Sequence, residues 1–123
     1  MKLIGSSIEK EYVDELRNSS SALFLNKRSH VLLESIRKSF HGVFSACILD
    51  CIPEQGEDIY TVLVDGAWVA EFEIPGGTEK LVEARNIRSV ESYRRGLRKQ
   101  RHLKLLVAMD LILKGELRVP FRS

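Results

Sequence analysis

The sequence predicts an α+β fold, in which an antiparallel sheet with a central β-hairpin packs against N-terminal and C-terminal helices. Three observations lead to this prediction: helical spacing of apolar residues before residue 41, strand-like runs between residues 43 and 74, and helical spacing again from residue 89. Helical segments on either side of a run of antiparallel strands are typical of α+β proteins. A chain of 123 residues can bury one hydrophobic core, so we expect a single domain over residues 1–123.

Two helices are expected before the sheet. In residues 6–17 the apolar side chains recur at helical spacing, and Ser6 with Glu9 three residues later matches a capping box. Residues 18–21 predict a break, and residues 22–25 predict a short strand or an ordered loop. A second helix is expected over residues 29–40, with Ser29 as its cap.

Three strands are expected at residues 43–52, 59–64 and 67–74, with a loop between the first two. Asp65 and Gly66 separate the last two strands. An Asp-Gly pair in this position predicts a two-residue type I′ turn, because both central residues of that turn need positive φ.

A two-residue turn fixes the register of the hairpin, with Val64 beside Ala67 and Asp58 opposite Glu73. Side chains alternate between the two faces of a strand. One face is then expected to be the core face, and it carries Ile59, Thr61, Leu63, Trp68, Ala70, Phe72 and Ile74. The other face is expected to carry the carboxylates of Asp58, Glu71 and Glu73 beside Tyr60.

Helical structure is expected again after the sheet. Ser89 opens a helical region that Gly96 divides into a short helix and a longer one over residues 100–114. Gly115 is the natural end of the longer helix, because glycine readily adopts the left-handed conformation that follows a helix.

Charge is segregated along the chain although the net charge is only +2. Residues 42–79 contain eight Asp and Glu and no Lys or Arg, whereas residues 85–104 contain eight Lys and Arg against the single acid Glu91. Such a distribution points to a charged partner more clearly than the net charge does.

The acidic hairpin is the candidate partner-binding site, and its residues are Glu54, Glu57, Asp58, Tyr60, Glu71 and Glu73. Like charges directly opposite each other destabilise a sheet, so a cationic group is expected to bind there unless the acids form only a solvated strand end. A basic protein surface is the favoured candidate. A magnesium or calcium ion at Asp58, Glu71 and Glu73 is the weaker one, because no Lys accompanies them as is usual in metal-dependent nucleases.

The basic segment supports an alternative function, a small nucleic-acid-binding or regulatory module. The side chains proposed for it are Arg94, Arg95, Arg98, Lys99 and Arg101, which could follow a phosphate backbone. Tyr93 is the one aromatic side chain available there for base stacking, and no known nucleic-acid-binding motif is present. A solvated basic helix, or one that pairs with the acidic sheet, explains the same segment.

Enzymatic activity is not expected, and neither is a cofactor or a bound metal. The three His residues are scattered, and the chain has no nucleophile elbow, no phosphate-binding Gly-rich loop and no paired His. Cys47 and Cys51 are expected to be buried free thiols. No apolar run approaches the ~20 residues of a membrane span, so a cytoplasmic protein is expected.

Two stretches together resemble a known class of protein. They are IPEQGEDIYTVLVDGAWVAEFEIP and SVESYRRGLRKQRHLKLLVAMDLILK. This pattern is similar to small bacterial immunity proteins of contact-dependent growth inhibition and related polymorphic-toxin systems, in which a central hairpin is followed by an S-x-E-x-Y helix start and a Leu- and Ala-rich helix. The resemblance covers roughly residues 22–115.

The resemblance implies a non-enzymatic antitoxin that acts by protein–protein interaction. Such a protein binds the C-terminal domain of a cognate toxin in the cytoplasm and blocks its active site. Many of these toxins are nucleases with basic substrate-binding surfaces, which an acidic inhibitor surface complements. No residue of this sequence is family-defining, so the resemblance assigns no individual contact residue.

Overall fold

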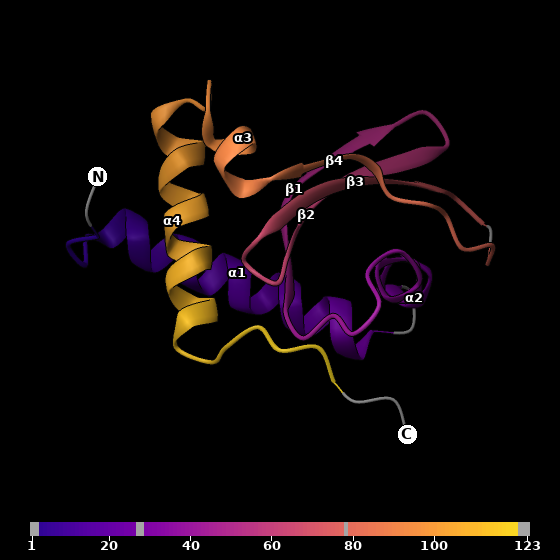
Figure 1. Cartoon of the computed structure of the whole chain (residues 1–123), viewed down its shortest axis with the longest axis horizontal. Helices are drawn as coiled ribbons and strands as arrows, with labels where there is room; N and C mark the ends of the chain where they lie inside the picture. The colour runs from indigo at the N-terminus through magenta and orange to yellow at the C-terminus, as the bar shows by residue number, and fades with distance from the viewer. Residues whose placement is uncertain (1–2, 27–28, 78, 121–123) are drawn as a thin grey trace.

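The computed structural model describes residues 3–26, 29–77 and 79–120 and has the predicted α+β architecture. In the described part of the chain, helices flank one four-stranded antiparallel sheet in the order β1-β2-β3-β4 (Figure 1). The elements are α1 (Ser7–Leu25), α2 (His30–Ser39), β1 (Ala46–Glu54), β2 (Glu57–Val64), β3 (Trp68–Pro75), β4 (Arg85–Ser89), α3 (Val90–Arg94) and α4 (Lys99–Leu113).

Helix α1 begins as predicted and ends later than predicted. The capping box is present, because the Ser6 hydroxyl accepts from Glu9 N at 3.3 Å while the Glu9 carboxylate accepts from Ser6 N at 3.3 Å. The predicted break at residues 18–21 is wrong, and so is the strand or loop at residues 22–25. Serine costs a helix only a fraction of a kcal/mol, and the burial of Leu16 and Leu23 on one side of α1 outweighs that cost.

The Glu9 carboxylate is buried and also accepts hydrogen bonds from the backbone of Ile4 and Gly5. Burial acts to raise the pKa of Glu9, but the hydrogen bonds from the Ser6 hydroxyl and from three backbone N–H groups outweigh it and lower this pKa. The carboxylate therefore stays ionised and holds the segment before α1 against the first turn of the helix.

The β2–β3 hairpin turns at Asp65 and Gly66 as predicted, with positive φ at both residues. The predicted pairing of Val64 with Ala67 is wrong, because Val64 pairs with Trp68 and Ala67 is left outside the ladder. Ala67 N donates to Val64 O at 3.0 Å, and Ala67 O accepts from Val90 N at 3.0 Å. The start of α3 therefore holds the extra residue in the turn, and every later pair moves by one position.

The shifted register redistributes the side chains of the hairpin between the two faces. Asp58 lies opposite Ile74 rather than Glu73, and Glu73 lies opposite Ile59. Glu71 and Glu73 therefore share a face with Ile59, and Asp58 and the partly buried Tyr60 occupy the other. The predicted single core face is also wrong, because helices cover both faces of the sheet near the turn.

Two buried clusters lie on the two faces of the sheet. The α4 core joins α1, α3 and α4 to the sheet and contains Leu16, Cys47, Leu49, Leu63, Val69, Val90, Tyr93, Leu105, Val107, Ala108, Leu111 and Leu117. The α2 core joins α2 and the end of α1 to the opposite face and contains Leu23, Leu32, Leu33, Ile36, Ala46, Val62, Val64, Ala70 and Phe72. Figure 1 shows α3 and α4 toward one end of the sheet, beyond which the β1–β2 hairpin extends.

Strand β1 contains a β-bulge that sequence analysis did not predict. Its ladder with β2 is regular up to Ile48 and resumes at Asp50, so the successive residues Leu49 and Asp50 lie on the same face. A bulge of this kind re-aims side chains and bends the strand. One consequence is that Cys47 and Cys51 are on opposite faces, with Cys47 buried and Cys51 exposed rather than both buried.

Strand β4 was also not predicted. Its five residues, RNIRS, show no apolar alternation, and four of them are exposed. They pair with β3 through Trp68–Ser89, Val69–Arg88 and Glu71–Arg85. The two helices after β4 agree with prediction, since α3 is capped by Ser89 and α4 extends to Leu113, just before Gly115. Within the described residues, no helix is both long enough and apolar enough to cross a membrane.

Candidate functional site

The uncovered half of the sheet, on the α4-core side, carries a cluster of acids that we call the open face. By the observed register, its carboxylates are those of Asp50, Glu54, Glu57, Glu71 and Glu73. Ile52, Ile59 and Thr61 lie between them, and Ile52 is 47% exposed. The strands here extend past α3 and α4 (Figure 1), so acidic side chains surround an accessible apolar centre.

The acids of the open face differ in their partners. Glu73 forms an ion pair with Arg85, and Glu71 accepts from Asn86 Nδ2 at 2.8 Å, so β4 neutralises part of this face. Glu54 and Glu57 lie directly opposite each other across the tight Gln55-Gly56 turn. Neither has an ion pair with another described residue. The unrelieved like-charge pair is therefore Glu54 with Glu57, and not Asp58 with Glu73 as the sequence predicted.

Four of the six predicted site residues lie on the open face and two do not. Glu54 and Glu57 belong to β1 and β2 rather than to a loop, and they join Glu71 and Glu73. Asp58 and Tyr60 point to the other face, so the predicted grouping of Asp58 with Glu71 and Glu73 is wrong. The part that any of the six plays in binding a partner stays a prediction.

Tyr60 lies beside Cys51 and Asp58 on the α2 side of the sheet. Partial burial raises the pKa of Tyr60, and the neighbouring Cys51 and Asp58 raise it further. Partial burial also raises the pKa of the Cys51 thiol, and the Asp58 charge acts in the same direction. Both groups are therefore kept in their neutral forms, which does not favour nucleophilic chemistry here.

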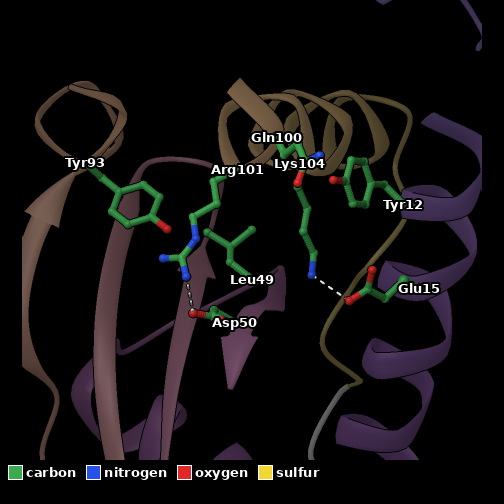
Figure 2. A pocket seen from close by; sticks show the side chains of 8 residues that line it. All are labelled: Tyr12, Glu15, Leu49, Asp50, Tyr93, Gln100, Arg101 and Lys104. Atoms are coloured by element: carbon green, nitrogen blue, oxygen red, sulfur yellow. Dashed lines mark hydrogen bonds and ion pairs between the residues drawn. The ribbon is translucent and has the colours of Figure 1, made fainter. Parts of the chain in front are cut away.

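A pocket of about 200 Å³ adjoins the open face where α1, β1, α3 and α4 meet (Figure 2). We call it the Tyr93 pocket. The residues that line it are Tyr12, Glu15, Leu49, Asp50, Tyr93, Gln100, Arg101 and Lys104. The bulge in β1 brings Leu49 and Asp50 to it together, and Arg101 and Lys104 reach it from one face of α4, one turn apart.

Two ion pairs hold the walls of the Tyr93 pocket. Lys104 Nζ is 2.7 Å from Glu15 Oε1, and Arg101 Nη2 is 3.4 Å from Asp50 Oδ2. Lys104 is much the more enclosed of the two bases, with a side chain 17% exposed against 62% for Arg101. These pairs confirm that part of the basic segment faces acids of the same chain.

Tyr93 is 9% exposed and its hydroxyl points into the pocket toward Arg101 (Figure 2). Burial raises the pKa of Tyr93, while the charge of Arg101 acts in the opposite direction. The Arg88 guanidinium lies 5.3 Å from the centre of the Tyr93 ring, within the range of a cation–π contact. Tyr93 is thus held in place by packing and by Arg88.

Four further bases of the segment lie at the end of α3, in the turn that follows it and at the start of α4. Arg94 ends α3 and pairs with Glu91 at 3.1 Å. Arg95, Arg98 and Lys99 are exposed in the turn and at the start of α4, without an acidic partner among the described residues. The amino end of α4 is therefore strongly positive, and it is separated from the Glu54–Glu57 end of the open face by the length of the sheet.

The described residues contain no group of three His, Cys, Asp or Glu side chains arranged to hold a metal ion. The trio considered from the sequence is split by the register, with Asp58 on one face and Glu71 and Glu73 on the other. Asp50 was not predicted as a member of the open face, and the Tyr93 pocket was not predicted at all. A bulge has no signature in this stretch of sequence, because Ile48, Leu49 and Asp50 fit a regular strand equally well.

The chain matches no protein-family model, and searches of curated proteins and of solved structures return no match.

Proposed function

We propose that the protein is an immunity protein that binds a cognate bacterial toxin domain and neutralises it by occluding the active site. The observation that supports this proposal most directly is the open face. Four of the five acids expected to contact the toxin lie on it, and Asp50 adds a fifth carboxylate to it. The toxin domain would present a basic surface, as the substrate-binding face of a nuclease does.

The arrangement of charge favours a protein partner over a free ion. Ile52 and Ile59 provide an apolar centre, and carboxylates surround it. This matches the general anatomy of protein interfaces, in which an apolar core is enclosed by a polar rim. Acids on the rim steer a basic partner toward the face and reject acidic ones.

Glu54 and Glu57 are the acids that would contribute most to binding the toxin domain. Their carboxylates face each other without a base among the described residues, so they repel each other in the free protein. A toxin Lys or Arg placed between them would relieve this repulsion as the complex forms. Glu71 and Glu73 would contribute less, because each already interacts with β4.

The test is a charge reversal on this hairpin. Glu54→Lys combined with Glu57→Lys should abolish co-purification with the cognate toxin domain, and should abolish protection of cells that express that domain. Truncating a charge that is paired and buried in an interface costs about 2–5 kcal/mol, and reversal costs at least as much. Circular dichroism should show an unchanged fold, since both side chains are exposed or half-buried.

Asp58→Lys is the matched control, because it changes charge on the same hairpin but on the opposite face. It should leave both co-purification and protection intact. Full protection by the Glu54→Lys, Glu57→Lys protein would contradict the proposal. Loss of protection with Asp58→Lys alone would indicate that the binding surface lies on the α2 side of the sheet.

A further inference from the structure

We propose that the Tyr93 pocket binds a phosphate-type oxyanion, held by the Arg101 guanidinium, the Lys104 ammonium and the Tyr93 hydroxyl at the amino end of α4. This site is separate from the Glu54–Glu57 end of the open face and does not depend on the proposed immunity function. It accounts for the basic segment, which a purely acidic interface leaves without a role.

The Tyr93 hydroxyl is the first observation behind this proposal. It belongs to a side chain more than nine-tenths buried, it points into the pocket, and it has no hydrogen-bond partner among the described residues. The hydroxyl opens into the pocket, so its proton is available to a ligand there. A ligand oxygen in the pocket would accept a hydrogen bond from this hydroxyl.

The amino end of α4 is the second observation behind this proposal. The first hydrogen bond at this end runs from His102 N to Arg98 O at 2.9 Å, so the amides of Lys99, Gln100 and Arg101 precede the helical ladder. Arg98 provides no side-chain cap for them. Unpaired amides and the helix dipole favour an anion here, and the first turn contains no acidic side chain to take that place.

The pocket bases retain donors for a ligand although each has an acidic neighbour. A guanidinium has five N–H donors, and the 3.4 Å separation of Arg101 from Asp50 is longer than the 2.7–3.2 Å usual for a hydrogen bond. The Lys104 ammonium has three donors, of which one reaches Glu15 at 2.7 Å. Asp50 and Glu15 then act as exchangeable partners that fill the site when no anion is bound.

The volume limits the size of the ligand. At about 200 Å³ the pocket is smaller than the roughly 300–1,000 Å³ that holds drug-sized molecules. It fits a single phosphate group, with any remaining part of the ligand outside the pocket. Two sources share this chemistry: a free phosphomonoester and a phosphodiester of a nucleic-acid strand.

The experiment is a titration of the full chain at constant ionic strength, followed by the amide NMR signals of residues 99–104. The probes are inorganic phosphate, adenosine monophosphate, and a single-stranded oligonucleotide without terminal phosphates. Saturation by phosphate or adenosine monophosphate identifies a phosphomonoester site, and saturation by the oligonucleotide alone identifies a phosphodiester site. No saturable shift with any probe would overturn the proposal.

Variants distinguish binding of the anion in the pocket from binding to the basic surface as a whole. Arg101→Gln and Tyr93→Phe should each weaken binding roughly tenfold or more, because each removes a hydrogen bond to a charged group. Asp50→Asn should strengthen it, because a competing carboxylate charge is removed. Arg95→Gln lowers the net charge equally but does not line the pocket. If Arg95→Gln weakens binding as much as Arg101→Gln does, the anion is held by the surface as a whole and the pocket proposal is wrong.

Discussion

Cys47 and Cys51 lie four positions apart on β1, and the bulge between them places their thiols on opposite faces. Burial raises the pKa of Cys47 to about 12, with Lys104 acting weakly in the other direction. Burial and the Asp58 charge also raise the pKa of Cys51, although this side chain is exposed. A regular strand would have placed both thiols on one face, which is why the sequence predicted that both are buried. The one extra residue in the bulge is therefore enough to bury one thiol and leave the other exposed.

We therefore expect a thiol reagent to modify Cys51 alone in the folded protein. Modification should be slow at neutral pH and should accelerate as pH rises, because the thiolate that reacts becomes populated only above the raised pKa of Cys51. Mass spectrometry after alkylation with and without urea measures this directly. Cys51→Ser is the control, and it should leave no reactive thiol until the chain unfolds. Equal labelling of both cysteines in the native protein would contradict the packing of Cys47.

At the level of helices and strands, prediction succeeded where end signals are local. The Ser6–Glu9 capping box, the Ser89 cap and Gly115 each act within one turn of a helix, and the structure confirms all three ends. The register of the β2–β3 hairpin and the presence of β4 could not be predicted from such local signals. Near the β2–β3 turn both faces of the sheet are buried, so apolar residues occur at consecutive positions and alternation does not distinguish one register from the next. The contact of Ala67 O with Val90 N that fixes the register is distant in sequence.

The turn residue Asp65 has a long-range role that a hairpin signal alone does not predict. Its Oδ1 accepts from Phe44 N at 2.9 Å and from Ser45 N at 3.0 Å, which joins the β2–β3 turn to the start of β1. We expect Asp65→Ala to lower the free energy of unfolding by about 1–3 kcal/mol, because these N–H groups lose their acceptor and φ remains +55°. Urea denaturation measures the loss.

Asp65→Asn is the matched control, since asparagine tolerates the left-handed conformation and keeps one acceptor oxygen. It should recover most of the stability lost in Asp65→Ala. Equal losses in the two variants would show that the negative charge, rather than the acceptor, stabilises the turn.

Across the whole molecule, the sheet is packed on both faces at one end and on one face at the other. The α4 core and the α2 core meet through β2 and β3. In β2, for example, the neighbouring residues Val62 and Leu63 point to opposite sides of the sheet. The segregation of charge along the sequence is partly compensated in space by Arg85–Glu73 and Arg101–Asp50. Glu54 and Glu57, which lack such an ion pair among the described residues, are at the end of the sheet that the helices do not cover.

Because the two cores share these strands, we expect the protein to unfold as one cooperative unit. Leu63→Ala in the α4 core should cost about 2–5 kcal/mol, and Phe72→Ala in the α2 core about 3–5 kcal/mol. Each variant should shift a single transition that is the same by far-ultraviolet circular dichroism and by the fluorescence of Trp68, the one tryptophan of the chain. Separate transitions by the two probes would mean that the cores unfold independently.

The uneven covering of the sheet also determines which positions of the sequence can change during evolution without loss of stability. Substitutions on a surface away from buried contacts usually change the free energy of unfolding by no more than about 0.5 kcal/mol. Glu54 and Ile52 are in this situation, whereas Leu63 and Val69, further along the same face, are fully or almost fully buried. A lineage can therefore alter the uncovered end repeatedly at little cost in stability, while selection on folding acts mainly on the covered end.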